Sequence, residues 1–491
     1  MEKLPVYSTK WSSNREEDRF VVNNPATGKR LAIVHGSGAQ EVDSCVRAAD
    51  KVFRDSWRWV EPHVRGRMLK QAARLIEQHL DEIAELETME EGKPIAISRG
   101  DVKRCIEAFE YFGGLAGNMP SELFDMGPTV SSVFLEPFGV VAGIIPFNWP
   151  PVHTAAKTAP ALAVGNTVVL KPGDQAPLSI MRIVELLQSV FPADVVQLVT
   201  GPGAETGIAL TGHPLVRKIS FTGSTNSGKA VLRQAAENVT PCMMELGGKN
   251  ALIVMPGCDL DEIIPVAYDG AFTNNGQACT ATSRLLIHRS LADEFTARFA
   301  EIVKKMRVGN GLDETVHVGP LVTAAQQQRV LDYIALGQKE GAVIAAQASL
   351  PTDPEYAEGY FVPPTLFSGV TPDMRIAKEE MFGPVTCVIP FDEPEEAVRI
   401  ANDSDYGLVG IVYSPDANLA SRVSRQLDVG TVYVNNFYRA GQDIVPFGGT
   451  KESGYGRERT IETLREFGYH KVVKTSSGLG VTRLSVPAEL L

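Results

Sequence analysis

The stretch Val141-Ala142-Gly143-Ile144-Ile145-Pro146-Phe147-Asn148-Trp149-Pro150 decides the fold class. Its first five residues form a short apolar run closed by a proline, which is typical of a strand buried on both faces. Similar runs follow at 167–170, 195–199 and 218–221, and a helical pattern at 180–191 is closed by Pro192. Strands and helices that alternate in this way predict a parallel sheet with right-handed crossovers, an architecture of the nucleotide-binding type.

A second series of strands and helices begins after residue 245. Strands are predicted at 251–255, 284–288, 385–389, 411–413 and 431–434, with a helix at 291–306 among them. This series predicts a second α/β domain. Nearer the N-terminus, apolar residues recur at helical spacing from 64 to 91, and Gly92-Lys93-Pro94 ends that predicted helix.

Length and charge exclude several classes of protein. A chain of 491 residues is too long for one core, so two or three domains are expected. The net charge is −12 and there is no long basic run, which argues against nucleic acid or an anionic membrane as a partner. The first residues lack the apolar core of a signal peptide, and no run approaches the ~20 apolar residues of a membrane span. A cytoplasmic protein is therefore expected.

The cysteines and histidines do not form recognisable clusters. No two of the six cysteines are closer than 16 residues, and the eight histidines are scattered. This spacing favours neither a disulfide framework nor a zinc site, so no metal is expected. A functional thiol in a reducing compartment is the consistent interpretation, with the other cysteines as small core residues.

One cysteine and one glutamate stand out by their surroundings. Cys279 lies between Ala278 and Thr280, so no bulky neighbour shields its sulfur. Glu245 lies 34 residues earlier, between an apolar run and a Gly-Gly pair, where a carboxylate needs a reason to leave water. A thiol and a carboxylate base are the groups needed to make and then hydrolyse a thioester. Either residue alone is explained as well by a structural cysteine or a surface glutamate, and the pair favours catalysis.

Three further motifs follow predicted strands. Asn148 stands where open parallel sheets keep their ligand crevices, and its amide can donate to a developing oxyanion. Lys171 and Asp174 follow the next strand, where a carboxylate can bind both ribose hydroxyls of adenosine. The glycine-rich turn at 223–228 precedes a helix and suits a pyrophosphate. Each motif alone also has a purely structural explanation. Asn148 is explained by a proline-bounded turn, Lys171 with Asp174 by a solvated loop, and the turn at 223–228 by an N-capped turn.

Taken together, these motifs resemble the aldehyde dehydrogenase superfamily, from about residue 20 to 475 and in the family's order and spacing. The resemblance implies an NAD-dependent enzyme that oxidises an aldehyde to the carboxylic acid and hydrolyses its acyl-enzyme. In that scheme Cys279 is the nucleophile that forms a thiohemiacetal and then a thioester. Glu245 activates the deacylating water, and Asn148 donates to the oxyanion together with the Cys279 backbone amide.

The resemblance also implies three structural units and a set of binding residues. A Rossmann-like cofactor domain would span 1–117 and 138–247, an α/β catalytic domain 248–450, and a bridging segment 118–137 and 451–491. The small sheet of that segment would use Val130–Glu136 and Phe467–Thr475 and pair across a homodimer or homotetramer. The implied cofactor residues are Ile145, Pro146, Phe147, Lys171, Asp174, Gly223, Ser224, Gly228, Leu246, Glu380 and Phe382. The implied substrate residues are Trp149, Val152, His153, Ala156, Ala278, Thr280, Arg439, Gly441 and Phe447.

Several residues depart from the family's pattern. Asp174 replaces a common glutamate and keeps its charge, which favours NAD over NADP. Ala156 and Gly441 stand where some members carry bulky aromatic residues, so a wide tunnel for bulky or aromatic aldehydes is expected. Phe147-Asn148-Trp149 inverts the family's Trp-Asn-Phe, and the arginine of semialdehyde-specific members is absent from Ala155-Ala156-Lys157.

Three alternatives remain open. Arg439 is the nearby cation that would bind a substrate carboxylate in a semialdehyde-specific enzyme. A CoA-acylating relative would transfer the acyl group to a thiol, but such relatives generally lack the Glu245 carboxylate. A non-catalytic binding or structural member is the third alternative, and the intact set of Cys279, Glu245, Asn148 and Glu380 argues against it.

Overall fold

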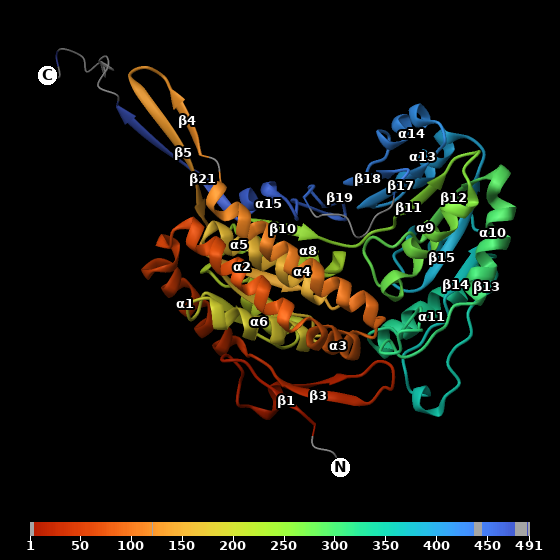
Figure 1. Cartoon of the computed structure of the whole chain (residues 1–491), viewed down its shortest axis with the longest axis horizontal. Coiled ribbons are helices and arrows are strands. Elements are labelled where there is room, and N and C mark those ends of the chain that lie inside the picture. Colours follow the sequence, from red (N-terminus) through yellow and green to blue (C-terminus); the bar gives the residue numbers. More distant parts are fainter. Residues whose placement is uncertain (1–3, 120, 437–443, 477–488, 490–491) are drawn as a thin grey trace.

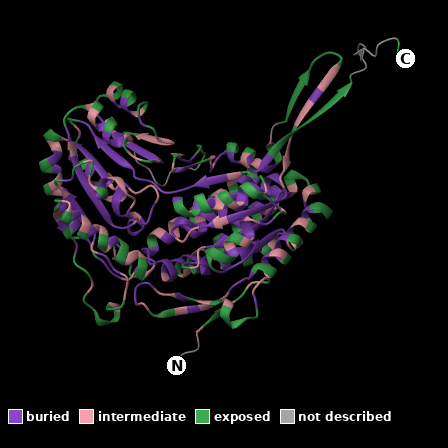
Figure 2. Cartoon of the chain, turned by 180° about the vertical axis from the view of Figure 1, so that it is seen from behind, coloured by how far each residue is buried: buried purple, intermediate pink, exposed green. Residues whose placement is uncertain are grey.

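The computed structural model describes residues 4–119, 121–436, 444–476 and 489. Two α/β lobes stand side by side, and a three-stranded sheet extends away from them (Figure 1). Most strands of the two lobes are buried, whereas the extending sheet is largely exposed (Figure 2). The predicted α/β fold, with two large sheets and a separate small one, is confirmed.

The first lobe is built on a six-stranded sheet. Its neighbouring strands are parallel except for the edge strand β20, which is antiparallel to β10. After β6 the chain adds β7 and β8 on one side and then β9 and β10 on the other, so the carboxyl end of β6 is a topological switch point. The four predicted strands are confirmed as β6 to β9. The order is β20 (Gly454–Tyr455), β10 (Cys242–Glu245), β9 (Val216–Thr222), β6 (Val140–Ile145), β7 (Thr167–Pro172) and β8 (Val196–Leu198).

Helices cover both faces of this sheet because successive strand residues point to opposite sides. Val141 and Ile145 of β6 join a core with α2, α4, α5 and α6, whereas Val140 and Ala142 join another with α1, α7 and α8. Apolar residues at every position of the strand are the reason that it is buried on both faces. The helices are α1 (Ala39–Asp55), α2 (Pro62–Gln78), α3 (Leu80–Glu91), α4 (Ile95–Leu115), α5 (Pro150–Val164), α6 (Leu178–Val190), α7 (Ile208–Thr211) and α8 (Thr225–Glu237).

The helix predicted from 64 to 91 is two helices, and the prediction of one continuous helix is wrong. His79 separates α2 from α3, with φ −114° and ψ 19°, and its N–H donates to the Ile76 oxygen three residues earlier. The apolar spacing continues through this break, so periodicity alone did not reveal it. Gly92, with φ +97°, ends α3 as predicted, because glycine adopts this left-handed conformation without strain.

The second lobe is built on a seven-stranded sheet that is parallel except for the edge strand β13. The predicted second series of strands is confirmed, and its residues again alternate between two cores. The order is β13 (Val343–Gln347), β14 (Thr365–Ser368), β15 (Val385–Phe391), β12 (Arg284–His288), β11 (Ala251–Val254), β17 (Val409–Tyr413) and β18 (Thr431–Val434). The helices are α9 (Leu260–Phe272), α10 (Arg289–Lys304), α11 (Ala324–Lys339), α12 (Arg375–Lys378), α13 (Pro394–Asn402) and α14 (Ala417–Ser424).

The extending sheet has the order β21-β5-β4, with all pairs antiparallel. Residues Gly468 to Ser476 of β21 pair with Pro137 to Thr129 of β5 within one chain. The helix α15 (Ile461–Glu466) precedes β21 and packs against α5. The remaining strands are β1 (Val6–Tyr7), β2 (Arg19–Asn23), β3 (Arg30–His35), β4 (Glu122–Asp125), β5 (Thr129–Pro137), β16 (Tyr406–Gly407), β19 (Thr450–Lys451) and β21 (Gly468–Ser476).

Candidate active site

Cys279 lies just after a tight turn that follows α9. Asn274, Asn275 and Gly276 in this turn have φ values of 56°, 57° and 70°, a left-handed conformation that asparagine and glycine tolerate best. A Cβ atom on Gly276 would overlap the backbone of Gly383, so the turn packs tightly against the loop that follows α12. The turn places Cys279, which is partly exposed, on the wall of a cavity.

Glu245 ends β10 and lines the same cavity, which has a volume of about 580 Å³. Its side chain is buried, and its Oε1 has no hydrogen-bond partner among the described residues. A Cβ atom on Gly448 would lie 2.8 Å from that oxygen, so the glycine leaves room for the carboxyl group. Cys279 and Glu245 therefore come from different lobes and meet at one cavity.

Two charged residues next to Glu245 were not predicted. Lys157 of α5 is fully buried, and its Nζ donates to Thr222 Oγ1 at 2.7 Å and to Glu458 Oε1 at 3.1 Å. Burial, and then the Glu458 carboxyl group, raise the pKa of Glu245 well above its usual value, while Lys157 opposes this shift. The cavity thus holds a carboxyl group that keeps its proton to higher pH than an exposed glutamate does.

Asn148 is tied directly to the turn that carries Cys279. Its side-chain Nδ2 donates to the backbone oxygen of Gln277 at 2.9 Å, and its own backbone oxygen accepts from Asn274 Nδ2 at 2.8 Å. Asn148 is 3% exposed. An amide nitrogen carries two hydrogens, so the bond to Gln277 leaves the second one for another acceptor.

The predicted cofactor residues of the first lobe lie at the carboxyl end of its sheet. Lys171 in β7 donates from Nζ to Asp174 Oδ1 at 2.8 Å and to the Pro172 oxygen at 2.7 Å. A Cβ atom on Gly203 would contact nothing within 4 Å, and one on Gly207 would lie 3.9 Å from the Lys171 side chain. Gly207 leaves space beside Lys171, and the Asp174 carboxylate bonded to this lysine suits the hydroxyl groups of an adenosine ribose.

The turn after β9 fits the phosphate groups of a dinucleotide. Gly223 follows the strand, and Ser224 caps α8 by accepting a hydrogen bond from the Ser227 N–H at 3.2 Å. A Cβ atom on Gly228 would lie 2.6 Å from Leu246, so glycine lets the first turn of α8 pack closely against the end of β10. The start of this 13-residue helix supplies backbone N–H groups that suit a pyrophosphate.

The second lobe brings two more predicted cofactor residues to the same edge. Glu380 Oε1 accepts a hydrogen bond from the Gly248 N–H at 2.9 Å, and burial raises the pKa of Glu380 to about 7. Phe382 adopts a left-handed φ of 60°, and its ring packs edge-on against Phe147 with a centroid distance of 5.9 Å. Phe147 follows Ile145 and Pro146 at the end of β6, so residues of both lobes converge there.

Most of the residues predicted to bind the substrate line this cavity, together with others. His153 lies in the wall of the cavity, and neither of its buried ring nitrogens has a hydrogen-bond partner within the described part of the chain. Burial, followed by the charges of Lys157 and Arg459, lowers the pKa of His153 well below its usual value. Ala278 is buried and does not line the cavity, and Arg439 and Gly441 lie outside the described residues. The predicted residues in the lining are Trp149, Val152, His153, Ala156, Thr280 and Phe447.

One face of α4 contributes lining residues that the sequence did not reveal. Arg104, Ala108 and Tyr111 recur at helical spacing on that face, but the same spacing also describes a helix packed on a core. The cavity also has residues from β18 and from the segments on either side of β19. The unpredicted lining residues are Arg104, Glu107, Ala108, Glu110, Tyr111, Phe112, Thr222, Thr431, Tyr433, Ile444, Val445, Pro446, Glu458 and Arg459.

The described part of the chain lacks disulfides, side-chain groups that could hold a metal ion and helices that could span a membrane. No disulfide joins any two of the six cysteines, all of which lie in the described residues. Within 4–119, 121–436 and 444–476, no group of three or more histidine, cysteine or carboxylate side chains is placed to hold a metal ion. Nor do those ranges contain a helix with the length and apolar character needed to cross a bilayer.

The chain is similar to known proteins over nearly its whole length. The model of the aldehyde dehydrogenase family matches residues 11–473. The aldehyde dehydrogenase citD of Monascus ruber is 50% identical over 480 residues, which cover 98% of this chain and 95% of that protein. Aldehyde dehydrogenase tropH of Talaromyces stipitatus is 40% identical over 494 residues, with 98% and 95% covered.

Solved structures show the same likeness. Betaine aldehyde dehydrogenase of Staphylococcus aureus in complex with NAD+ superimposes with a TM-score of 0.92 at 35% identity, covering 96% of this chain and 94% of that one. An NAD+ complex of an aldehyde dehydrogenase from Bacillus cereus gives a TM-score of 0.90 at 37% identity, covering 94% and 93%. The chain therefore belongs to the aldehyde dehydrogenase family.

Proposed function

We propose that the protein oxidises an aldehyde to the carboxylic acid with NAD, through a thioester on Cys279 that water then hydrolyses. The observation that carries this proposal is that Cys279 and Glu245 line one cavity, while Asn148 is bonded to the turn of Cys279. The NAD+ complexes of the Staphylococcus aureus and Bacillus cereus relatives support the choice of cofactor. Formation of NADH from a reactive aldehyde, with the acid identified by mass spectrometry, tests it.

In the proposed reaction a carbon–sulfur bond forms at Cys279 and is later broken by water. The Cys279 thiolate attacks the aldehyde carbon, and the oxygen takes the charge and faces donors such as the Asn148 amide. The chemistry supplied by bound NAD is acceptance of a hydride from that carbon, which leaves a thioester. Glu245 then removes a proton from water, the hydroxide adds to the thioester, and cleavage of the carbon–sulfur bond releases the acid and the thiolate.

The proposed cofactor site divides between the two lobes. Lys171 and Asp174 would hold the adenosine ribose, and the turn from Gly223 to Gly228 would hold the pyrophosphate, with Leu246 packed beneath it. Glu380 would hold the nicotinamide ribose next to Phe382. Glu380 Oε1 accepts from the Gly248 N–H, and a carboxylate with two oxygens can accept from a ribose hydroxyl as well.

Cofactor preference is expected to depend on Asp174. Its side chain is 31% exposed, and its negative charge repels a 2′-phosphate but accepts a hydrogen bond from a free 2′-hydroxyl. We expect kcat/KM to be higher with NAD than with NADP, and Asp174→Ser to narrow the difference. Steady-state kinetics with both cofactors measure this, and equal kcat/KM values in the unmodified enzyme would contradict it.

The cavity supports a bulky substrate. Its volume of about 580 Å³ lies within the range typical of small-molecule sites, and apolar side chains such as Trp149, Val152 and Phe447 form much of its wall. Ala156 adds only a methyl group to the wall. We therefore propose that bulky aldehydes, including aromatic ones, are substrates.

A panel of aldehydes tests the breadth of the site. We expect benzaldehyde and larger aromatic aldehydes to have kcat/KM values at least equal to that of acetaldehyde. Ala156→Phe should lower the values for the aromatic aldehydes and spare acetaldehyde, because a ring at this position fills space that only a large substrate needs. The idea fails if a carboxylated semialdehyde exceeds every neutral aldehyde tenfold, a difference of about 1.4 kcal/mol.

The alternatives give distinct outcomes in the same assays. A semialdehyde-specific enzyme would show the tenfold preference, with Arg439 as the first cation to replace. A CoA-acylating enzyme would need a thiol for turnover and release an acyl-thioester instead of the acid. A non-catalytic member would bind NAD and form no NADH with any aldehyde.

We also propose that the chain is divided into the three units that the resemblance implies. The sheet of β4, β5 and β21 would join this chain to further copies of itself. Leu123 and Val472 on this sheet are apolar yet 68% and 52% exposed, and contact with a second copy would cover such residues. Light scattering should then show a dimer or tetramer, and Val472→Lys should weaken the association of the copies.

The six cysteines without a disulfide support a cytoplasmic location, which fractionation of the source cells tests.

A further inference from the structure

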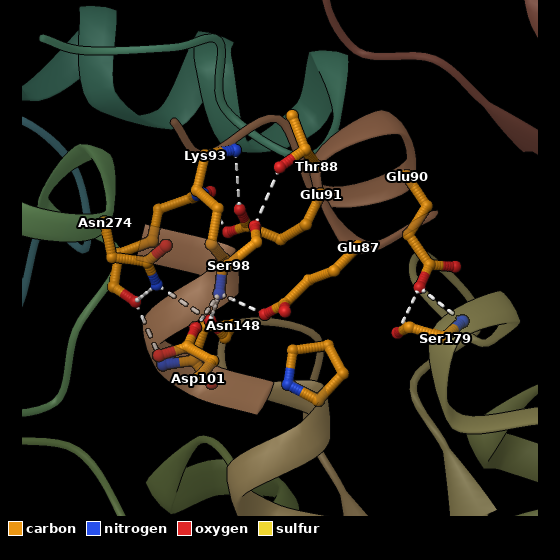
Figure 3. A network of polar contacts seen from close by, with 12 residues as sticks. Glu87, Thr88, Glu90, Glu91, Lys93, Ser98, Asp101, Asn148, Ser179 and Asn274 are labelled. Atoms are coloured by element: carbon orange, nitrogen blue, oxygen red, sulfur yellow. Dashed lines mark hydrogen bonds and ion pairs between the residues drawn. The ribbon is translucent and has the colours of Figure 1, made fainter. Parts of the chain in front are cut away.

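Lys93 is a buried cation that the proposed chemistry does not use. It lies in the loop between α3 and α4, and its side chain has no exposed surface. Its Nζ donates to Glu87 Oε1 at 2.6 Å, to Asp101 Oδ2 at 2.9 Å and to the backbone oxygen of Asn148 at 2.6 Å (Figure 3). The ammonium also lies 4.6 Å from the centre of the Trp149 ring.

Packing alone gives little reason for a charge at this position. Burial opposes the charge of Lys93, but Asp101, Glu87 and Glu91 outweigh that effect and raise its pKa above the usual value. These carboxyl groups therefore favour the charged form of Lys93. Apolar side chains of similar volume often stabilise a protein as well as a buried ion cluster does. The contact between Lys93 and Asn148 offers a different reason.

The first connection from Lys93 reaches the proposed oxyanion donor. The Asn148 backbone oxygen accepts from Lys93 Nζ and from Asn274 Nδ2, the latter at 2.8 Å. The Asn148 side chain donates to the Gln277 oxygen at 2.9 Å, and Asn274 Nδ2 contacts that oxygen at 3.1 Å. Bonds at both the backbone and the side chain leave Asn148 little freedom to move its amide.

The second connection reaches the turn of Cys279 by way of Glu91. Glu91 Oε2 accepts from the backbone N–H of Lys93 at 2.9 Å, and its Oε1 accepts from Gln277 Nε2 at 2.8 Å. Gln277 Oε1 in turn accepts from the Val322 N–H at 3.1 Å. Gln277 precedes Cys279 by two residues, so the loop at Lys93 holds both the donor and the nucleophile segment.

We propose that Lys93 is a positioning residue that holds the Asn148 amide and the Cys279 turn in the arrangement needed for attack on the aldehyde. The inference rests on the proposed roles of Cys279 and Asn148. Loss of a whole oxyanion donor slows an enzyme by about 10²–10³-fold, and a donor that is displaced but present should cost less. Loss of Lys93 is therefore expected to slow acylation about tenfold or more.

The test compares two variants at Lys93. Lys93→Met removes the donor to Asn148 but leaves two carboxyl groups buried without their cation, which can unfold the protein. Lys93→Met with Glu87→Met replaces the ion pair by apolar side chains, and Asp101 keeps its contact with Arg104 Nη1 at 3.4 Å. We expect the double variant to recover thermal stability relative to the single variant. We expect its NADH burst to remain at least tenfold slower than in the unmodified enzyme.

Glu90→Gln is a matched control from the same helix. Glu90 is as buried as Glu87, but it points away from Lys93 toward Ser179, where it accepts from the N–H at 2.9 Å and from Oγ at 2.6 Å (Figure 3). Its hydrogen bonds within the described residues go to Leu178 and Ser179, and none joins it to Asn148 or to the Cys279 turn. We expect Glu90→Gln to lower stability and to leave the burst rate within twofold of the unmodified enzyme.

The outcomes separate a positioning role from a purely structural one. A slow burst in the stable double variant, with the dissociation constant for NAD changed less than twofold, supports the proposal. A burst rate that returns together with stability would overturn it, because Asn148 would then not need the Lys93 donor. Failure of the proposed function is distinct, since the unmodified enzyme itself would then form no NADH.

Discussion

Cys279→Ala is expected to abolish NADH formation with every aldehyde and to leave NAD binding intact. In the proposed mechanism the thiol supplies the sulfur that carries the acyl group, and Cys279 is the one cysteine among the described residues that line the cavity. The substitution removes one sulfur atom from a partly exposed position, so the fold should be preserved. Steady-state assays at high enzyme concentration measure the loss, and fluorescence titration measures NAD binding.

Cys258→Ala is the matched control for this prediction. Cys258 is also a partly buried free thiol of the second lobe, but it does not line the cavity. We expect this variant to keep the activity of the unmodified enzyme. Residual turnover above about 1% in Cys279→Ala would contradict the assignment of the nucleophile, as would an equal loss of activity in the control.

Glu245→Gln is expected to separate acylation from deacylation. Glutamine keeps the shape of the side chain and cannot take a proton from water, so the first hydride transfer should proceed and the thioester should persist. A burst approaching one NADH per active site should precede a turnover slowed ~100-fold or more, the usual range for loss of a general base. Stopped-flow absorbance measures both phases, and normal steady-state turnover would refute the scheme.

The pH dependence follows from the same carboxyl group. Burial and Glu458 raise the pKa of Glu245 above its usual value, and the protonated form cannot act as a base. Turnover limited by deacylation should therefore rise with pH through a range above that of an ordinary glutamate, and level off once Glu245 is ionised. In Glu245→Gln this rise should be absent, so identical profiles for the two enzymes would exclude Glu245 as its source.

The fold could be predicted where the pattern reflected burial on both faces of a strand. The apolar run at 141–145 has this pattern, and the structure has β6 there with a core on each side. The break at His79 could not be predicted, because it depends on a change of backbone angles within an unbroken apolar pattern. Periodicity reports which face is buried, and it says little about where a helix changes direction.

The residues of the candidate site could be predicted where a short sequence motif surrounds a reactive side chain. Cys279, Glu245 and Asn148 each stand in such a motif, and the structure brings Cys279 and Glu245 to one cavity with Asn148 bonded beside it. Lys157 and Glu458 could not be paired from the sequence, because they lie 301 residues apart and meet only through tertiary folding. The sequence indicates Lys93 only as part of the end of a helix. In the sequence its partners Glu87 and Asp101 cannot be told from charged residues on the surface.

The most direct test of the account is the intact mass of Glu245→Gln after it is mixed with NAD and an aromatic aldehyde. The proposed mechanism predicts one acyl group per chain, bound to Cys279 as a thioester and removed by hydroxylamine. The peptide that contains Cys279 should carry the added mass, and the same treatment of Cys279→Ala should add none. A burst of NADH without any adduct, or an adduct on another residue, would contradict the central claim that the aldehyde is oxidised on Cys279.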